Sequence, residues 1–292
     1  MRNKSLFVVV PGETCINNCA YCPGRIAPIK GIPCLTEDSV HYSLCRSDYI
    51  RRMEFARDNG CNTLIITGKC EPQQSKTFLE KIGMINNELH KPFPIIEMQT
   101  TGTQLTKEYL FFLRANIQVT TIALSLAAFD DKTNNNILGM HEDNYINLAS
   151  LCETIKQLGL NLRLSIHLTE YFDIYKNNPA TLFDDAKKRF HADQLILRKL
   201  NAVGTTPQAE WVRNHSASPQ TLAEIKNYIS QYGRYPITIE FDRVRYSLHG
   251  LSVAIDEHGL KADDDGFNKS YVILRSNGKL YSHWNDEGSL IF

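Results

Sequence analysis

The stretch "LFVVVPGETCINNCAYC", residues 6–22, decides the fold, because it places a cysteine-rich loop directly after a buried strand. Residues 6–10 are all apolar and mostly β-branched, which is typical of a parallel strand buried on both faces. Cys15, Cys19 and Cys22 follow, with three and then two residues between them. In α/β folds, active sites form in the loops that follow the carboxyl ends of strands.

Five further apolar runs resemble this first strand, and amphipathic stretches separate them. This alternation indicates parallel strands joined by right-handed crossovers. The residues alone leave two closures open, an open doubly wound sheet and a curved (β/α) barrel, complete or partial. The predicted strands are 6–10, 63–67, 94–99, 121–126, 162–168 and 194–200, and the predicted helices are 37–60, 76–90, 106–117, 144–159 and 179–191.

The composition changes after residue 200. Residues 201–220 are polar, with one glycine and two prolines, and predict a linker. A helix over 220–233 with Ser218 as its N-cap follows, and then a β-rich tail. We therefore expect a core domain at 1–200 and a C-terminal α+β extension at 201–292. The strands predicted in the tail are 236–242, 251–256 and a hairpin that turns at Asn277-Gly278.

Charge and hydropathy exclude several classes of protein. The 292 residues include 32 basic and 32 acidic side chains, a balance that argues against a dedicated binder of duplex DNA. The apolar run at 6–10 is too short for a signal peptide core or a membrane span, and no later stretch is long enough. The eight cysteines then fit a reducing cytoplasm, where clustered thiols serve metal or redox chemistry.

Three thiolates on one loop suit an iron–sulfur cube that leaves its fourth iron open to a substrate or cofactor. Zinc sites commonly use two pairs of ligands, and no second Cys/His pair follows at a workable spacing. Three alternatives stay open: a chance cluster of buried cysteines, a zinc site, and an electron-transfer cluster. The last two would be completed by Cys34, Cys45 or Cys70. We interpret Cys34 and Cys45 as ordinary thiols, and Cys61 and Cys152 as core residues.

The cysteine spacing, with Tyr21 directly before the third cysteine, resembles the signature of the radical S-adenosylmethionine (radical SAM) superfamily. The resemblance implies that Cys15, Cys19 and Cys22 hold a [4Fe–4S] cluster whose unique iron binds the methionine part of S-adenosylmethionine (SAM). It places Tyr21 near the adenine. It also implies a six-stranded partial TIM-like (β/α) barrel, which selects between the two closures.

Later strand ends continue the resemblance. "TGKCEP" (67–72) is similar to the family's Gly-x-Gly-Glu-Pro loop, with Cys70 in place of the second glycine; a positive φ there would strain it. "QTTG" (99–102) and "LSLAAFD" (124–130) resemble two further family segments, and three polar residues of the fifth strand share one face. The SAM-binding residues that the resemblance implies are Tyr21, Gly68, Cys70, Glu71, Gln99, Ser125, Arg163, Ser165, His167 and Lys199.

Some of these residues also fit a purely structural role. His167 equally fits a hydrogen-bonded interior histidine. Arg198 and Lys199 occupy opposite faces of the sixth strand, so one of them should point inward and hold an anion. The alternative for that cation is a salt bridge to Glu97 or Asp193.

The resemblance implies an enzyme that reductively cleaves SAM to a 5′-deoxyadenosyl radical and abstracts hydrogen from a substrate. Its electron would come from an external one-electron reductant of the flavodoxin or ferredoxin kind. The chain has no cysteine after Cys152, which speaks against a second cluster, and its neutral charge speaks against bulk RNA. We favour a small-molecule or nucleotide-like substrate. The alternatives are a peptide- or RNA-modifying enzyme, a glycyl-radical activase and, outside catalysis, an iron–sulfur or zinc-binding module.

Overall fold

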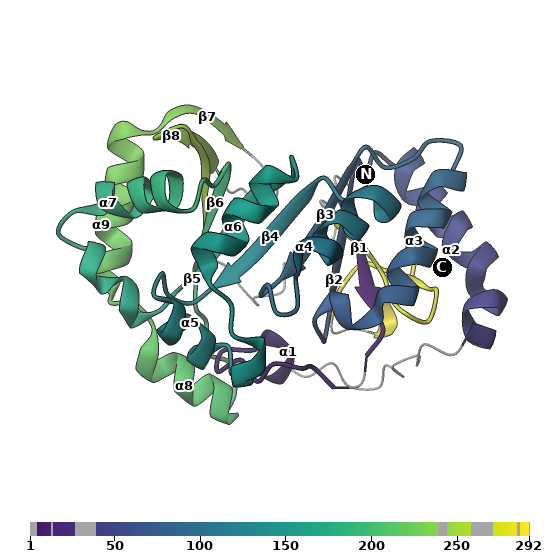
Figure 1. Ribbon diagram of the computed structural model, residues 1–292, viewed down its shortest axis with the longest axis horizontal. Helices are drawn as coiled ribbons and strands as arrows, with labels where there is room; N and C mark the ends of the chain where they lie inside the picture. Colours follow the sequence, from purple (N-terminus) through teal and green to yellow (C-terminus); the bar gives the residue numbers. More distant parts are fainter. Residues whose placement is uncertain are drawn as a thin grey trace.

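One mixed sheet organises the chain (Figure 1). The computed structural model describes residues 5–12, 14–26, 39–238, 244–257, 271–284 and 287–291, and for 39–45 the backbone only. Within these ranges the sheet has the strand order β11-β10-β1-β2-β3-β4-β5-β6-β9-β8-β7. The strands are β1 (Ser5–Val10), β2 (Thr63–Gly68), β3 (Ile95–Thr100), β4 (Thr121–Leu126), β5 (Asn161–Leu168), β6 (Gln194–Lys199), β7 (Arg234–Thr238), β8 (Val244–Leu248), β9 (Leu251–Asp256), β10 (Tyr271–Leu274) and β11 (Leu280–Tyr281).

Strands β1 to β6 pair in parallel and in chain order, as the alternation predicted. Their carboxyl ends therefore lie along one edge of the sheet, and the loops that follow them meet there. Helices connect the strands, and α4 and α7 each continue into a π-helical turn. The helices are α1 (Pro23–Ile26), α2 (Ser39–Asp58), α3 (Lys76–Glu88), α4 (Lys107–Phe112), α5 (Asp131–Ile137), α6 (Leu148–Gln157), α7 (Pro179–Asp184), α8 (Pro207–His215) and α9 (Pro219–Tyr232).

The C-terminal segment extends the sheet at both edges. Strand β9 pairs in parallel with β6, and β10 pairs in parallel with β1. Strands β7 and β8 continue antiparallel beyond β9, and β11 folds back on β10 through a turn in which Gly278 has φ +73°. The predicted hairpin is confirmed. Strands from both sides of residue 201 belong to this one sheet. The division into 1–200 and 201–292 stays a prediction.

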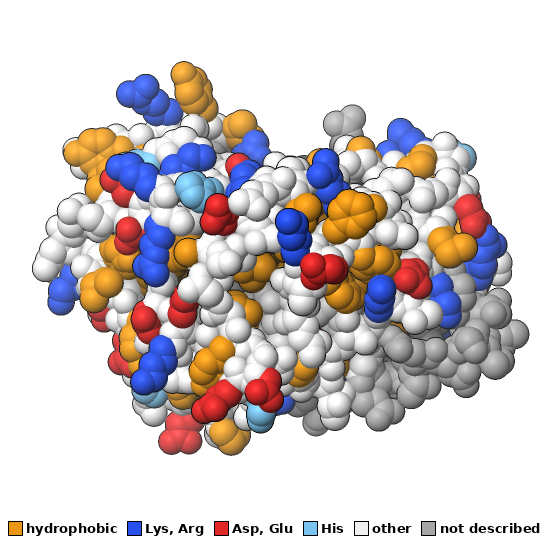
Figure 2. All heavy atoms as spheres, in the orientation of Figure 1, with side chains coloured by type: hydrophobic (Ala, Val, Ile, Leu, Met, Phe, Trp, Pro, Cys, Tyr) orange, Lys and Arg blue, Asp and Glu red, His pale blue; other side chains and the backbone are white. Residues whose placement is uncertain are grey.

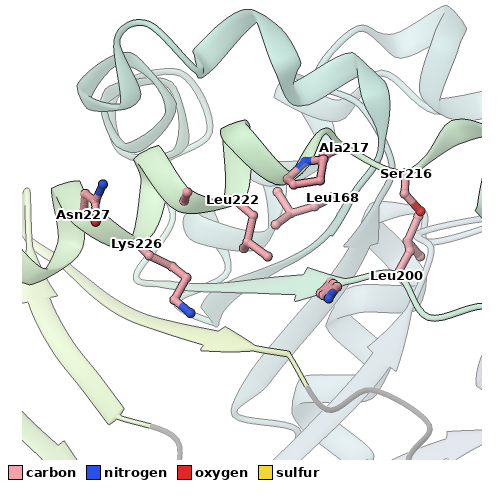
Figure 3. A pocket seen from close by; sticks show the side chains of 10 residues that line it. Leu168, Leu200, Ser216, Ala217, Leu222, Lys226 and Asn227 are labelled. Carbon is pink, nitrogen blue, oxygen red and sulfur yellow. The ribbon is translucent and has the colours of Figure 1, made fainter.

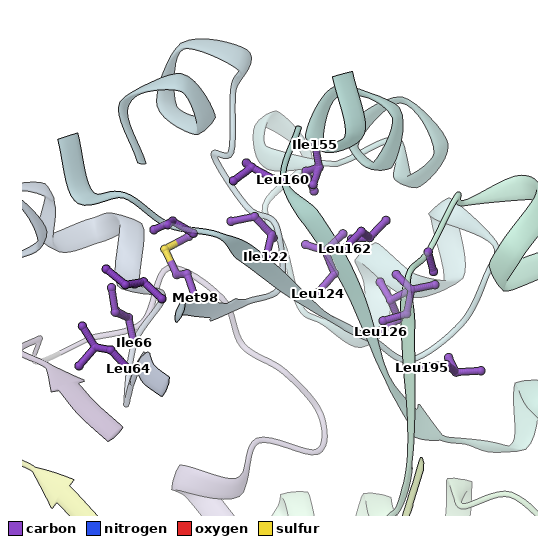
Figure 4. Packing of buried hydrophobic residues seen from close by; sticks show 14 of the residues in the cluster. Leu64, Ile66, Met98, Ile122, Leu124, Leu126, Ile155, Leu160, Leu162 and Leu195 are labelled. Atoms are coloured by element: carbon purple, nitrogen blue, oxygen red, sulfur yellow. The ribbon is translucent and has the colours of Figure 1, made fainter. Parts of the chain in front are cut away.

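Alternate strand residues pack against the helices. Leu64, Met98, Leu124 and Leu162 are fully buried in this layer (Figure 4), together with apolar side chains of α2, α3, α4, α6, α7 and α9. Since successive strand residues point to opposite faces, the remaining positions form the other face of the sheet, which we call the inner face. The predicted core residues Cys61 and Cys152 are buried, as expected.

Residues 201–220 contain a helix, so the linker prediction is wrong. Thr206 caps α8 by accepting a hydrogen bond from the Ala209 N–H at 3.2 Å, and Pro207 occupies the first turn. Ala209 and Val212 are buried in a small apolar cluster with Tyr21 and other residues near the cysteine loop. In Figure 1, α8 lies beside α1, with which it is in contact. The predicted N-cap of α9, Ser218, is confirmed.

Basic and acidic side chains are interspersed over the face drawn in Figure 2. This distribution agrees with the balanced composition. In the part of the chain that the structure describes, no helix combines the length and the apolar character that a membrane crossing requires.

We predict that Met98→Ala destabilises the protein far more than Met84→Ala. Met98 is fully buried on β3, whereas the Met84 side chain on α3 is 61% exposed. The first change leaves a cavity and should cost about 2–5 kcal/mol in the free energy of unfolding, while the second should stay within about 0.5 kcal/mol. Urea unfolding of both variants measures this difference, and equal losses would contradict the packing described here.

Candidate functional site

The cysteine loop leaves β1 and is held against the end of α5. The Asn18 N–H donates to the Gly139 carbonyl at 3.1 Å, and the Ala20 N–H donates to the Ile137 carbonyl at 2.9 Å. Gly139 has φ +58°, and a Cβ there would overlap with the Asn18 carbonyl. Glycine is therefore required at this close approach.

The three cysteines are free thiols with partly exposed side chains. A turn closes between the last two, in which the Cys22 N–H donates to the Cys19 carbonyl at 3.2 Å. Burial raises the pKa of Cys15 and, more strongly, that of Cys19, and the negative charge of Glu71 raises both further. The thiols also oppose one another's ionisation, so a bound cation that neutralises them would relieve this repulsion. This donor set fits a thiolate-bound metal cluster.

A single-ion site would need ligand side chains that converge on one point. Among the described residues, no group of three His, Cys, Asp or Glu side chains has the geometry to hold a metal ion. A cubane binds its thiolates at separate iron corners, so its ligands need not converge on one point. Cys34 and the side chain of Cys45 lie outside the described residues.

Tyr21 is buried directly beside the third cysteine. The centroid of its ring lies 4.4 Å from the centroid of the His167 ring and 6.2 Å from that of the Trp211 ring on α8. Its hydroxyl is buried and has no hydrogen-bond partner among the described residues, and burial raises the pKa of the phenol well above its usual value. Because buried hydroxyls are normally satisfied, a bound molecule next to Cys22 would supply a missing acceptor.

The loop after β2 carries Glu71, whose carboxylate points toward the loop after β3. Oε2 of Glu71 accepts hydrogen bonds from the Thr100 hydroxyl at 2.6 Å and the Thr101 N–H at 3.1 Å. The Gln73 amide donates to the same oxygen at 3.0 Å. These bonds join the loops that follow β2 and β3 at the edge where the cysteine loop lies.

Cys70 fills the glycine position of this loop without strain, since it is not among the described residues with positive φ. Its sulfur packs against Gly12, where an added Cβ would lie only 2.8 Å from it. Gly68 is equally close-packed: a Cβ there would come within 3.1 Å of the Val10 carbonyl oxygen. Both residues therefore shape the backbone beside the cysteine loop.

The inner face brings four of the predicted residues together. Ser125 and Ser165 are direct partners across β4 and β5, and Arg163 and His167 lie on the same face of β5. Gln99 donates to Glu97 at 3.2 Å, and Glu97 forms an ion pair with Arg163 at 2.5 Å. Sequence reasoning did not place Glu97 in the site, although a lone acid inside an apolar strand is a signal for a buried pair.

The two basic residues at the end of β6 lie on opposite faces of the sheet. Arg198 faces inward, opposite His167, and pairs with Asp256 of β9 at 2.7 Å. Lys199 points to the helix layer and lines a cavity of ≈ 410 Å³ against α9 (Figure 3), apart from the other predicted site residues. The alternative, a salt bridge from the inward cation to Glu97 or Asp193, is wrong. Those two acids pair instead with Arg163 and Lys156.

The comparisons with known proteins agree with this architecture. Residues 9–180 match the model of the Radical SAM superfamily, which is more than half of the chain. The chain belongs to the Radical SAM superfamily. Members of this superfamily are enzymes that use a [4Fe–4S] cluster and SAM, and the sheet corresponds to their partial barrel. No curated protein matches the sequence.

Solved structures show the same fold at low identity. Coproporphyrinogen III oxidase (HemN) from Escherichia coli is 15% identical with a TM-score of 0.53, over 79% of this chain and 53% of that one. The chain thus spans about half the length of that enzyme. The structure of anSMEcpe with bound AdoMet is 17% identical with a TM-score of 0.58, over 96% and 74% of the two chains. A form with AdoMet and a peptide is 13% identical with a TM-score of 0.57, over 99% and 77%.

We predict that His167 makes stability depend on pH. Burial, and to a lesser extent Arg198, lowers the pKa of His167 to about 3. In the unfolded chain a histidine titrates near pH 6.5, so below that value the unfolded state binds a proton that the folded state does not. The stabilisation is present above pH 6.5 and is lost as the pH falls toward 3.

The measurement compares the free energy of unfolding of wild type and His167→Gln between pH 7 and pH 4. The wild-type curve should be steeper by up to about 1.4 kcal/mol per pH unit, the value for one proton. His141→Gln is the matched control, because the His141 side chain is 73% exposed. Parallel curves for all three proteins would show that the pKa of His167 is not lowered in the folded protein.

Proposed function

We propose that Cys15, Cys19 and Cys22 ligate the [4Fe–4S] cluster of this radical SAM enzyme. The observation that carries the proposal is the set of three free thiols on one loop, fixed at the carboxyl edge of the parallel strands. Three ligands leave one iron of a cube open, and that position would take SAM. When bound, the cluster and SAM would supply the chemistry of reductive SAM cleavage and of hydrogen removal from the substrate.

The chain's own side chains would bind and orient SAM. Arg163 carries a positive charge on the inner face, beside the hydroxyls of Ser125 and Ser165, and these groups suit the carboxylate of the methionine part. The guanidinium is oriented by Glu97 and by Gln194, which accepts from its Nε at 2.8 Å. A preoriented guanidinium loses less entropy on binding an anion.

Aromatic side chains and α8 would shield the site from water. Tyr21, His167 and Trp211 form a continuous group of rings between the cysteine loop and α8. His167 stays uncharged at neutral pH because its pKa is about 3, so this wall would place no charge beside a bound nucleoside. Exclusion of water protects reactive intermediates from side reactions.

The substrate that the inner face fits is a polar small molecule or a nucleotide-like compound. The support is the presence of two ion pairs, Glu97–Arg163 and Arg198–Asp256, on the surface that faces the reaction space. Peptide modification is the second candidate, because the peptide-bound structure corresponds to nearly the whole chain. An external flavodoxin- or ferredoxin-like protein would deliver the electron. The free thiols suit a reducing compartment such as the cytoplasm.

We predict that Cys15→Ala, Cys19→Ala and Cys22→Ala each abolish the release of 5′-deoxyadenosine from SAM by the anaerobically reconstituted protein with dithionite. Each change removes one of the thiolates that the cube requires. Wild type should hold about four irons per chain, as expected for one cube. Cys152→Ala, a change at a buried cysteine of α6, should keep both the iron and the cleavage. Retained cleavage in a triple cysteine variant would end the proposal.

A further inference from the structure

Asn17 joins the cysteine loop to two other loops. It lies between the first two cysteines and is 2% exposed. Its side-chain amide donates to the hydroxyls of Thr101 and Thr103, both at 2.8 Å, and its nitrogen lies 3.4 Å from Oε1 of Glu71. The Thr103 hydroxyl is also 3.1 Å from the side-chain oxygen of Asn17. One buried carboxamide thus connects the loops after β1, β2 and β3.

Glu71 is the acceptor at the centre of this connection. It is 7% exposed, and its carboxylate makes no ion pair among the described residues. Thr100, Thr101 and Gln73 satisfy one of its oxygens, and Asn17 faces the other. A buried carboxylate held only by neutral donors depends on each of them, because an unmet acceptor costs its full desolvation penalty.

The same two residues reach the first cysteine through their backbones. The N–H groups of Asn17 and Glu71 hydrogen-bond to the Cys15 sulfur. Their side chains face one another, so the side-chain contact fixes the spacing of the two backbone donors. Hydrogen bonds to cysteine sulfurs tune iron–sulfur clusters, and residues that orient ligands affect how firmly the metal is held.

We propose that Asn17 and Glu71 are positioning residues for the cluster, and that their side-chain contact locks the cysteine loop in its ligating shape. This inference rests on the proposed function, because it assumes that the three cysteines hold the cluster. It assigns Glu71 a role through the loop, since neighbouring residues already occupy its carboxylate. Asn17 is one of the three residues between Cys15 and Cys19, to which the resemblance assigns no role.

The test exchanges the hydrogen-bond donor and acceptor in the contact between the Asn17 and Glu71 side chains. Asn17→Asp places a carboxylate opposite Glu71, and Glu71→Gln places an amide donor opposite the amide of Asn17, so each single change creates a mismatch. In the double variant the introduced amide donates to the introduced carboxylate, while the oxygen of that amide still accepts from Thr100 and Thr101. A double-mutant cycle isolates this pairwise coupling. Asn18→Asp is the matched control, since the Asn18 side chain is exposed on the same loop.

The readout is the rate at which anaerobically reconstituted protein loses iron to a chelator at pH 8. We expect about 10-fold or more faster loss in each single variant, because residues that orient metal ligands contribute about 10–100-fold to affinity. The double variant should return to within about threefold of wild type, and Asn18→Asp should match wild type. Urea unfolding of the iron-free proteins reports on the fold separately.

Single variants that hold iron as wild type does would overturn the inference, as would a double variant no better than the sum of the two singles. Should a single variant fail to fold, Thr103→Val removes one hydroxyl at similar volume and carries the same expectation. Wild type that takes up no iron would refute the proposed function instead, so the two failures are distinguishable.

Discussion

The buried hydrogen bonds between the loops after β1, β2 and β3 are the constraint on which the site depends. A cysteine loop on its own would be mobile, because loops have few apolar contacts to hold them. Here Asn17 and Glu71 are both buried, and Thr101 donates and accepts within the same group. These bonds hold the cysteine loop against the loops that follow β2 and β3.

Apolar packing holds the same loop from the other side. Tyr21 and Ile26 are buried with Val212 of α8 in a cluster separate from the main core. Because α8 follows β6 in the chain, Val212 lies nearly two hundred residues after Tyr21, and the two nevertheless pack together around the cysteine loop. Strand β9 contributes in the same way, because its Asp256 neutralises Arg198 on the inner face. The C-terminal segment therefore completes the site as well as the sheet.

Local patterns predicted the parallel strands and most of the helices, because buried strands read as continuous apolar runs. Pairing between distant segments leaves no local signal, so the placement of β10 beside β1 was not predicted. The helix α8 was missed because its buried stripe, Ala209 and Val212, is small, although Thr206 and Pro207 carried a start signal. The cysteine spacing predicted the cysteine loop. It did not decide which of Arg198 and Lys199 faces inward, and the structure places Lys199 on the helix side of the sheet. The partners of Arg163 and Arg198 depend on register across strands, which the sequence does not display.

The central claim is that one iron of a thiolate-bound cube is open to SAM. The most direct measurement is the electron paramagnetic resonance spectrum of the reconstituted, dithionite-reduced protein, recorded anaerobically with and without SAM. The account predicts a reduced [4Fe–4S] signal whose g-values shift when SAM is added, because SAM would change the ligands of one iron. A protein with no such signal, or a signal that SAM leaves unchanged, would contradict the account.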